Sequence, residues 1–180
     1  LYVNSSHAGI GMGTNSVEPL RDNAPIDNTL DLGVGSARWD DIYATNATIQ
    51  TSDQNEKQSI QALTSTEIAV AKRISKLFKT FKFNSSVEKK GDNARTHTGI
   101  IAQNVQQAFT DEGLDASNYA LFILSTWWEN EEGDIKEEAT EGYTERTRLG
   151  IRYPELLSFI SSAFEQRLTD IETRVTALEG

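Results

Sequence analysis

Residues 154–180 read PELLSFISSAFEQRLTDIETRVTALEG and carry a regular apolar repeat. Apolar residues recur there every three or four positions, which is the spacing of a coiled-coil helix with one four-residue insertion near Arg167. Pro154 suits the first turn of such a helix. The narrow seam predicts packing against copies of the same helix, and the β-branched Ile171 at the second core position favours three strands. The alternative is an amphipathic helix that packs on its own domain. The seam residues are Leu157, Ile160, Phe164, Leu168, Ile171, Val175 and Leu178.

The preceding segment, residues 52–153, mixes helical and extended patterns. Thr64-Ser-Thr-Glu67 has the form of a helix-capping box, and apolar residues follow it at helical spacing. We expect a further helix over 98–109, and either a buried strand or a short buried helix over 119–128. Extended segments are expected over 80–84 and 143–153, and loops over 85–93 and 129–141. The segment is therefore predicted to be an α+β domain.

Residues 1–51 are glycine-rich and are typical of short extended segments broken by turns. Gly9-Ile-Gly-Met-Gly-Thr14 alternates glycine with apolar or small residues, which would let backbones of several chains approach one axis. Ala47-Thr-Ile-Gln-Thr51 has the alternation of a half-buried strand. We expect a β-rich stalk over 1–51, with a flexible linker as the alternative. The predicted molecule is an elongated homotrimer with this stalk, a mixed helix and strand domain over 52–180, and a trimeric coiled coil from about residue 154.

Composition argues against several classes of function. The 180-residue chain has a formal net charge of −10, and a nucleic-acid partner would require a basic face. The absence of cysteine excludes disulfides and thiolate metal sites. The sequence contains no apolar run of about 18 residues, so no segment is predicted to insert into a membrane. His7 and His97 are the only histidines, and neither lies in a zinc-binding or nucleophile-elbow motif, so we expect no metal and no cofactor.

Ser52 and Lys57 remain as a pair that could carry catalysis. A neutral lysine amine can take the proton of a serine hydroxyl and so turn the serine into a nucleophile. Residues five apart on one helix lie on different faces, so the pair requires Ser52 to precede the helix while Lys57 reaches back. Such a spacing occurs often by chance, and the residues alone leave Ser52 open to a simple role as a helix cap.

Four motifs taken together resemble the C-terminal intramolecular chaperones of endosialidase-type phage tailspikes and long tail fibres. They occur in the order of that family, are followed by the terminal coiled coil, and cover residues 31–180. The motifs are Leu32-Gly-x-x-x-x-Arg-Trp-x-x-Ile-Tyr-Ala44, Thr48-Ile-x-Thr-Ser-Asp-x-x-x-Lys57, Arg95-x-His-x-Gly-Ile-Ile-Ala-Gln103 and Leu149-Gly-Ile-Arg-Tyr-x-Glu-Leu156.

This resemblance implies a chaperone that assembles three chains into an intertwined fibre or spike and then releases itself. It implies a cut between Thr51 and Ser52, made once by a self-cleaving serine endopeptidase with Ser52 as nucleophile and Lys57 as base. Asp53 and His97 are implied as supporting residues. The expected partners are two identical chains and the upstream stalk as folding client. The expected location is the phage virion, after folding in the host cytoplasm.

Three other functions are weighed against this one. A trimeric fibre tip could remain uncut and bind a host receptor, with Ser52 as a helix cap. A related self-cleaving domain occurs in membrane-bound eukaryotic transcription factors, but the glycine-rich, stalk-like residues 1–51 argue against that setting. A hydrolase of diffusible substrates is disfavoured because no second catalytic cluster is visible.

Overall fold

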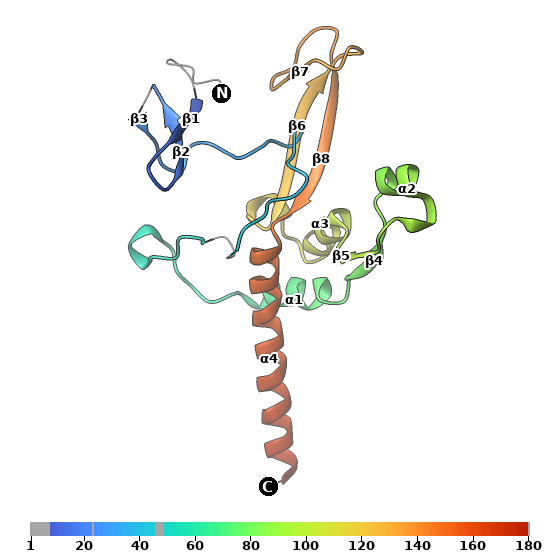
Figure 1. Ribbon diagram of the computed structural model, residues 1–180. Helices are drawn as coiled ribbons and strands as arrows, with labels where there is room; N and C mark the ends of the chain where they lie inside the picture. The colour runs from blue at the N-terminus through green and yellow to red at the C-terminus, as the bar shows by residue number, and fades with distance from the viewer. Residues whose placement is uncertain (1–7, 23, 46–48, 180) are drawn as a thin grey trace. The chain divides into compact units, whose positions relative to one another are not determined.

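The computed structural model describes residues 8–22, 24–45 and 49–179, and the chain divides into two compact units, Leu1–Asn46 and Ala47–Gly180 (Figure 1). The first unit contains three short strands, and the second contains the remaining helices and strands. Among the described helices, none combines the length and apolarity that a bilayer span requires.

The first unit is built on an antiparallel sheet of strand order β1-β2-β3, with β1 (Ala8–Met12), β2 (Val17–Arg21) and β3 (Ala24–Pro25). A Cβ on Gly11 would lie 2.8 Å from Cδ1 of Leu20, so glycine lets the leucine side chain lie across β1. Residues 26–45 form turns and bends without further strands. Short extended segments broken by turns are thus present, and the multi-chain stalk stays a prediction.

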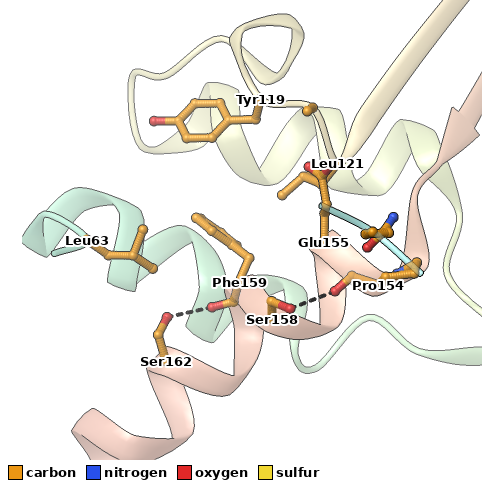
Figure 2. Close-up of a pocket in the computed structure, with 10 residues that line it drawn as sticks. Leu63, Tyr119, Leu121, Pro154, Glu155, Ser158, Phe159 and Ser162 are labelled. Carbon is orange, nitrogen blue, oxygen red and sulfur yellow. Dashed lines mark hydrogen bonds between the residues drawn. The ribbon is translucent and has the colours of Figure 1, made fainter. Parts of the chain in front are cut away.

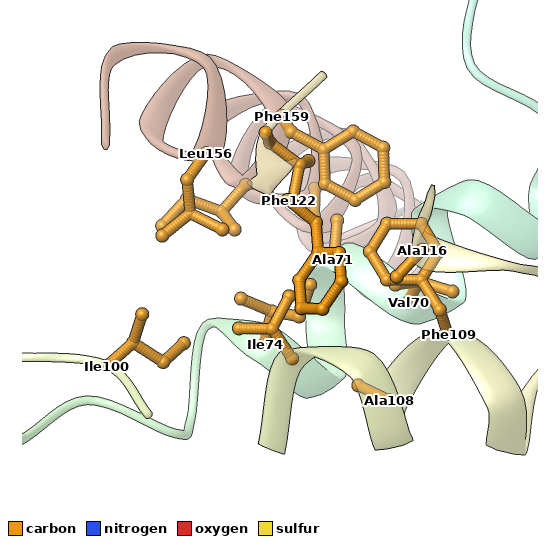
Figure 3. Close-up of a cluster of buried hydrophobic side chains, with 14 residues drawn as sticks. Val70, Ala71, Ile74, Ile100, Ala108, Phe109, Ala116, Phe122, Leu156 and Phe159 are labelled. Atoms are coloured by element: carbon orange, nitrogen blue, oxygen red, sulfur yellow. The ribbon is translucent and has the colours of Figure 1, made fainter. Parts of the chain in front are cut away.

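The core of the second unit lies where α1 (Ser65–Ile74), α3 (Ala102–Asp111) and the first turns of α4 (Tyr153–Glu179) meet (Figure 3). Helix α1 contributes the apolar face that its spacing predicts. The helix expected over 98–109 begins only at Ala102, because Thr98 and Gly99 pair with another strand. The face that α4 turns to the core is Leu156, Phe159, Ile160 and Ala163, of which Ile160 alone belongs to the predicted seam. Truncation of one large buried side chain here is expected to cost about 2–5 kcal/mol of stability. The largest fully buried side chains are Phe109, Ile74, Leu156, Val70 and Val105.

The N-terminus of α1 confirms the predicted capping box. The Glu67 backbone N–H donates to Thr64 Oγ1 at 3.2 Å, and the Thr64 N–H donates to Glu67 Oε2 at 2.6 Å. The Tyr119 hydroxyl donates to the other carboxylate oxygen at 3.0 Å. The bonds from the backbone and side chain of Thr64 and from Tyr119 outweigh burial and lower the pKa of Glu67. Burial and the bond to Glu67 raise the pKa of Tyr119.

A long antiparallel hairpin follows α3. β6 (Phe122–Glu129) pairs with β8 (Thr144–Ile151) along its whole length, and the two-residue β7 (Ile135–Lys136) pairs with the far end of β6. The Arg148 guanidinium lies 5.0 Å from the centre of the Trp127 ring. The strand predicted within 119–128 and the extended segment predicted over 143–153 are confirmed as β6 and β8, but β6 is buried only at Phe122, so the prediction of a buried strand is wrong for the rest of it. The acidic stretch forms the hairpin tip, with Gly133 in a turn at φ +87°.

The loop predicted for residues 85–93 is wrong. That segment forms α2 (Asn84–Lys90) and the 3-10 turn η2 (Gly91–Asn93), inserted between the paired strands β4 (Lys79–Phe81) and β5 (His97–Gly99). Val87 is the only large apolar residue of α2, so the sequence offers no periodic apolar face from which to predict the helix. Gly91, at φ +53°, ends the helix.

Helix α4 begins at the predicted proline turn and runs for 27 residues. Its first turns pack in the core, Asp170 Oδ2 still lies 3.8 Å from Lys72 Nζ of α1, and its C-terminal part extends past the other elements of its unit (Figure 1). The seam residues from Phe164 to Leu178 are 45–86% exposed. The long helix is confirmed, whereas its assembly into a trimeric coiled coil stays a prediction.

Residues 49–63 lead into α1 and form no strand. The strand expected over 47–51 is therefore wrong for 49–51, and residues 47 and 48 lie outside the described residues. A strand requires a pairing partner, and none of the described strands pairs with this segment. The only regular element here is the 3-10 turn η1 (Gln54–Glu56).

Candidate functional site

Ser52 and Lys57 are in direct contact on opposite sides of η1. Lys57 Nζ donates to Ser52 Oγ at 2.7 Å and lies 3.4 Å from the Ser52 carbonyl oxygen. Ser52 precedes the turn, and Lys57 follows it in an extended conformation with φ −120° and ψ 148°. A single 3-10 turn therefore solves the spacing problem that a continuous α-helix would pose for residues five apart.

Asp53 caps the turn that brings the pair together. Its Oδ1 accepts from the Asn55 backbone N–H at 2.9 Å and from Asn55 Nδ2 at 3.0 Å. The Lys57 N–H closes the turn by donating to the Gln54 carbonyl at 3.1 Å. In the part of the chain that the structure describes, no ion pair joins Asp53 or Glu56 to Lys57. The structure thus gives Asp53 the contacts of a positioning residue.

Solvent reaches the whole segment that contains the pair. Every residue from 49 to 62 is exposed in the single chain. A lysine acts as a base only in its neutral form, which burial favours over the charged form. In the single chain, Ser52 and Lys57 are therefore in contact, but both are exposed to water.

His97 lies apart from this contact, on β5. Its ring stacks on Phe81 at 5.9 Å between centroids and meets Phe83 edge-on at 4.9 Å. None of the hydrogen bonds found among the described residues joins His97 to Ser52 or Lys57. In one chain, His97 is a member of an aromatic cluster at the exposed end of the β4–β5 ribbon.

A pocket of about 400 Å³ lies beside the residues that lead into Ser52 (Figure 2). Gln50 is part of its lining, two residues before Ser52. Sequence reasoning did not predict this pocket, because its walls come from segments far apart in the chain. The remaining lining is mainly apolar and includes Leu63, Tyr119, Leu121, Pro154 and Phe159.

Metal chemistry has no visible basis in the described residues. They contain no group of three or more histidine, aspartate or glutamate side chains placed to hold an ion. The chemistry available at the site is that of a hydroxyl, an amine and the backbone beside them.

Comparison with known proteins identifies the second unit. Residues 52–114 match the family described as "Chaperone of endosialidase". The carboxy-terminal domain of the bacteriophage T5 L-shaped tail fibre, solved with its intramolecular chaperone domain, superposes with a TM-score of 0.67 and 26% identity. That match covers 94% of this chain and 44% of the T5 chain. Residues 52–114 of the second unit belong to this family of intramolecular chaperones. A second structure, described as a novel intramolecular chaperone, matches at TM-score 0.54 and 27% identity over 64% of this chain and 97% of its own.

The sequence relatives of this chaperone are phage tail proteins. A probable tail spike protein of Klebsiella phage 0507-KN2-1 is 34% identical over an alignment of 161 residues that covers 79% of this chain. The chain spans only 13% of the length of that protein. The resemblance found in the four motifs is therefore confirmed at the level of the family.

Proposed function

We propose that this chain trimerises a phage tail fibre or tailspike and then cuts itself between Thr51 and Ser52. The observation that carries the proposal is the 2.7 Å contact between Lys57 Nζ and Ser52 Oγ. The family match begins at Ser52, the residue that would become the new N-terminus, and the family is classed among peptidases. Both facts support a cut at this bond.

The proposed reaction begins with an acyl shift within the chain. Lys57 Nζ, in its neutral form, takes the Ser52 hydroxyl proton, and Oγ attacks the Thr51 carbonyl carbon through a five-membered ring. The Thr51 C–Ser52 N bond breaks as Lys57 returns the proton to the departing amine. The product is an ester between the Thr51 carbonyl and Ser52 Oγ. Water then cleaves the ester, leaving Thr51 with a carboxylate and Ser52 with a free hydroxyl and amine.

Assembly of three copies would supply what the single chain lacks. The exposed seam of α4 offers an apolar surface for two further helices. Contacts between neighbouring units outside the α4 seam would then restrict water at residues 49–62 and favour neutral Lys57. Cleavage would then follow correct assembly, once per chain.

The same arrangement explains a chaperone role. Intertwined β stalks form few local contacts, so their pairing is slow and their register can slip. A helical trimer holds three chain ends at high effective concentration while the stalk forms. Removal of residues 52–180 would then leave residues 1–51 on a stalk whose persistence depends on slow unfolding. In this proposal the stalk stays in the virion, and folding takes place in the host cytoplasm.

Intact-mass measurement of the expressed chain tests the proposal directly. We expect the parent to split after Thr51, and Ser52→Ala and Lys57→Ala to remain whole while keeping the parent's oligomeric state. Lys57→Arg should also remain whole, because a guanidinium does not give up its proton at neutral pH. A parent that trimerises and stays uncut would contradict the protease and favour an attached, receptor-binding tip.

A further inference from the structure

The pocket beside the scissile bond has no assigned role, and its walls are already formed. Ser158 Oγ donates to the Pro154 carbonyl at 2.8 Å, and Ser162 Oγ donates to the Phe159 carbonyl at 2.6 Å (Figure 2). The two serines are thus satisfied within α4, and the pocket has an apolar wall that needs no polar ligand. It is suited to the methylene part of a side chain.

The pocket does not lie on the trimer seam. Glu155, Ser158 and Ser162 line it and lie on one face of α4. At 100° per residue, that face is roughly 145° around the helix from the seam residues such as Leu157 and Phe164. Coiled-coil formation would therefore leave the pocket uncovered, and a neighbouring α4 is not its natural occupant.

The segment that leads into the cut bond does reach the pocket. Gln50 contributes to its lining and is itself exposed in the single chain, and the adjacent Ile49 is 98% exposed. We infer that the pocket is the binding subsite for the residue-50 side chain of the same chain, so that Gln50 is a positioning residue for autoproteolysis. This inference rests on the proposed function. Residues 49–51 pair with no described strand, so a side-chain contact two residues before Ser52 would be what fixes the orientation of the Thr51 carbonyl toward Ser52 Oγ.

Substitutions at residue 50 should change the cleavage rate in a pattern that a passive linker would not produce. Gln50→Leu should cleave at least as fast as the parent, because the wall is mainly apolar. Gln50→Asp should cleave at least about tenfold more slowly, because its charge would lie against an apolar wall that also carries the Glu155 carboxylate. Gln58→Leu and Gln58→Asp are matched controls on the other side of the pair and should follow the parent. Cleavage is timed by intact mass after refolding. An unchanged rate for Gln50→Asp would overturn the subsite, whereas an uncut parent would overturn the proposed function instead.

A crosslink tests the pocket independently of cleavage. The chain contains no cysteine, so a Gln50→Cys, Ser158→Cys pair can be introduced into the Ser52→Ala variant without competing thiols. A short thiol-to-thiol crosslinker should join the two within one chain, as seen by mass under denaturing conditions. The matched pair Gln58→Cys, Ser158→Cys should not join. Crosslinks only between chains, or equal yields for both pairs, would overturn the same-chain subsite.

Discussion

The distance between the Ser52 and Lys57 side chains depends on a third side chain, that of Asp53. Asp53 caps the turn through Asn55, and the turn returns Lys57 Nζ to Ser52 Oγ. An N-terminal cap of this kind contributes about 1 kcal/mol, which is enough to bias an exposed segment toward the contact geometry. Asp53→Asn keeps an acceptor oxygen at this position and should therefore preserve the cap.

His97 can be tested as a packing residue or as one whose imidazole nitrogens are required. Because its ring stacks on Phe81 and meets Phe83 edge-on, His97→Ala should lower stability by roughly 1 kcal/mol and slow processing. His97→Phe retains a ring without the imidazole nitrogens and should process near the parent rate. Thermal melts and cleavage time courses of both variants decide the matter. Equal slowing in the two variants would show that the imidazole itself is required.

At the scale of elements, the start of α1 links the helix to the loop before β6. Glu67 holds the Thr64 N–H, and the Tyr119 hydroxyl donates to the same carboxylate. Tyr119 also lines the pocket beside Gln50 and contacts Phe109 in the core. The cap therefore stabilises both the core and one wall of the candidate subsite.

The lowered pKa of Glu67 gives this cap a pH dependence. A carboxylate whose pKa is lower in the folded than in the unfolded chain adds stability above its ordinary value of about 4.5. That stability is lost as the pH falls from about 4.5 through the lower folded pKa. Glu67→Gln should lessen this loss, and Thr64→Ala should cost about 1 kcal/mol at neutral pH. Urea unfolding of the Ser52→Ala background between pH 3 and pH 7 measures both, and parallel curves for parent and Glu67→Gln would contradict the assignment.

At the scale of the whole molecule, cleavage and assembly should be coupled through α4. Ile171 and Leu178 are exposed in the single chain and lie on the same seam. Changing both to Asp would place charges in the interior of a coiled coil, so the trimer should dissociate and cleavage should cease.

A matched control carries the same added charge on the opposite face of α4. The pair Thr169→Asp, Thr176→Asp should remain trimeric and should cleave. Sedimentation of Ser52→Ala versions reports assembly, and intact mass of the active versions reports cleavage. Monomers that still cleave would separate catalysis from assembly and remove the need for enclosure by neighbouring chains.

The amino-acid sequence by itself determined the features that depend on neighbours along the chain. The capping box at Thr64 and the seam of α4 follow from spacings of three and four residues, which are local properties of a helix. Helix α2 was not predicted, because Val87 is its one large apolar residue and a single residue cannot show helical spacing. The four motifs identified the family because their order, unlike any one spacing, is specific.

The tertiary structure decided what depends on residues distant in the chain. Strand pairing is one case: residues 49–51 alternate like a strand but find no partner, and pairing is not encoded in one segment. The pocket is another, because Gln50, Leu63, Tyr119 and the first turns of α4 meet only when the helices pack around their shared core. The contact between Ser52 and Lys57 lies between these cases. Its five-residue spacing is visible in the sequence, but only the capped 3-10 turn brings the hydroxyl and the amine within hydrogen-bonding distance.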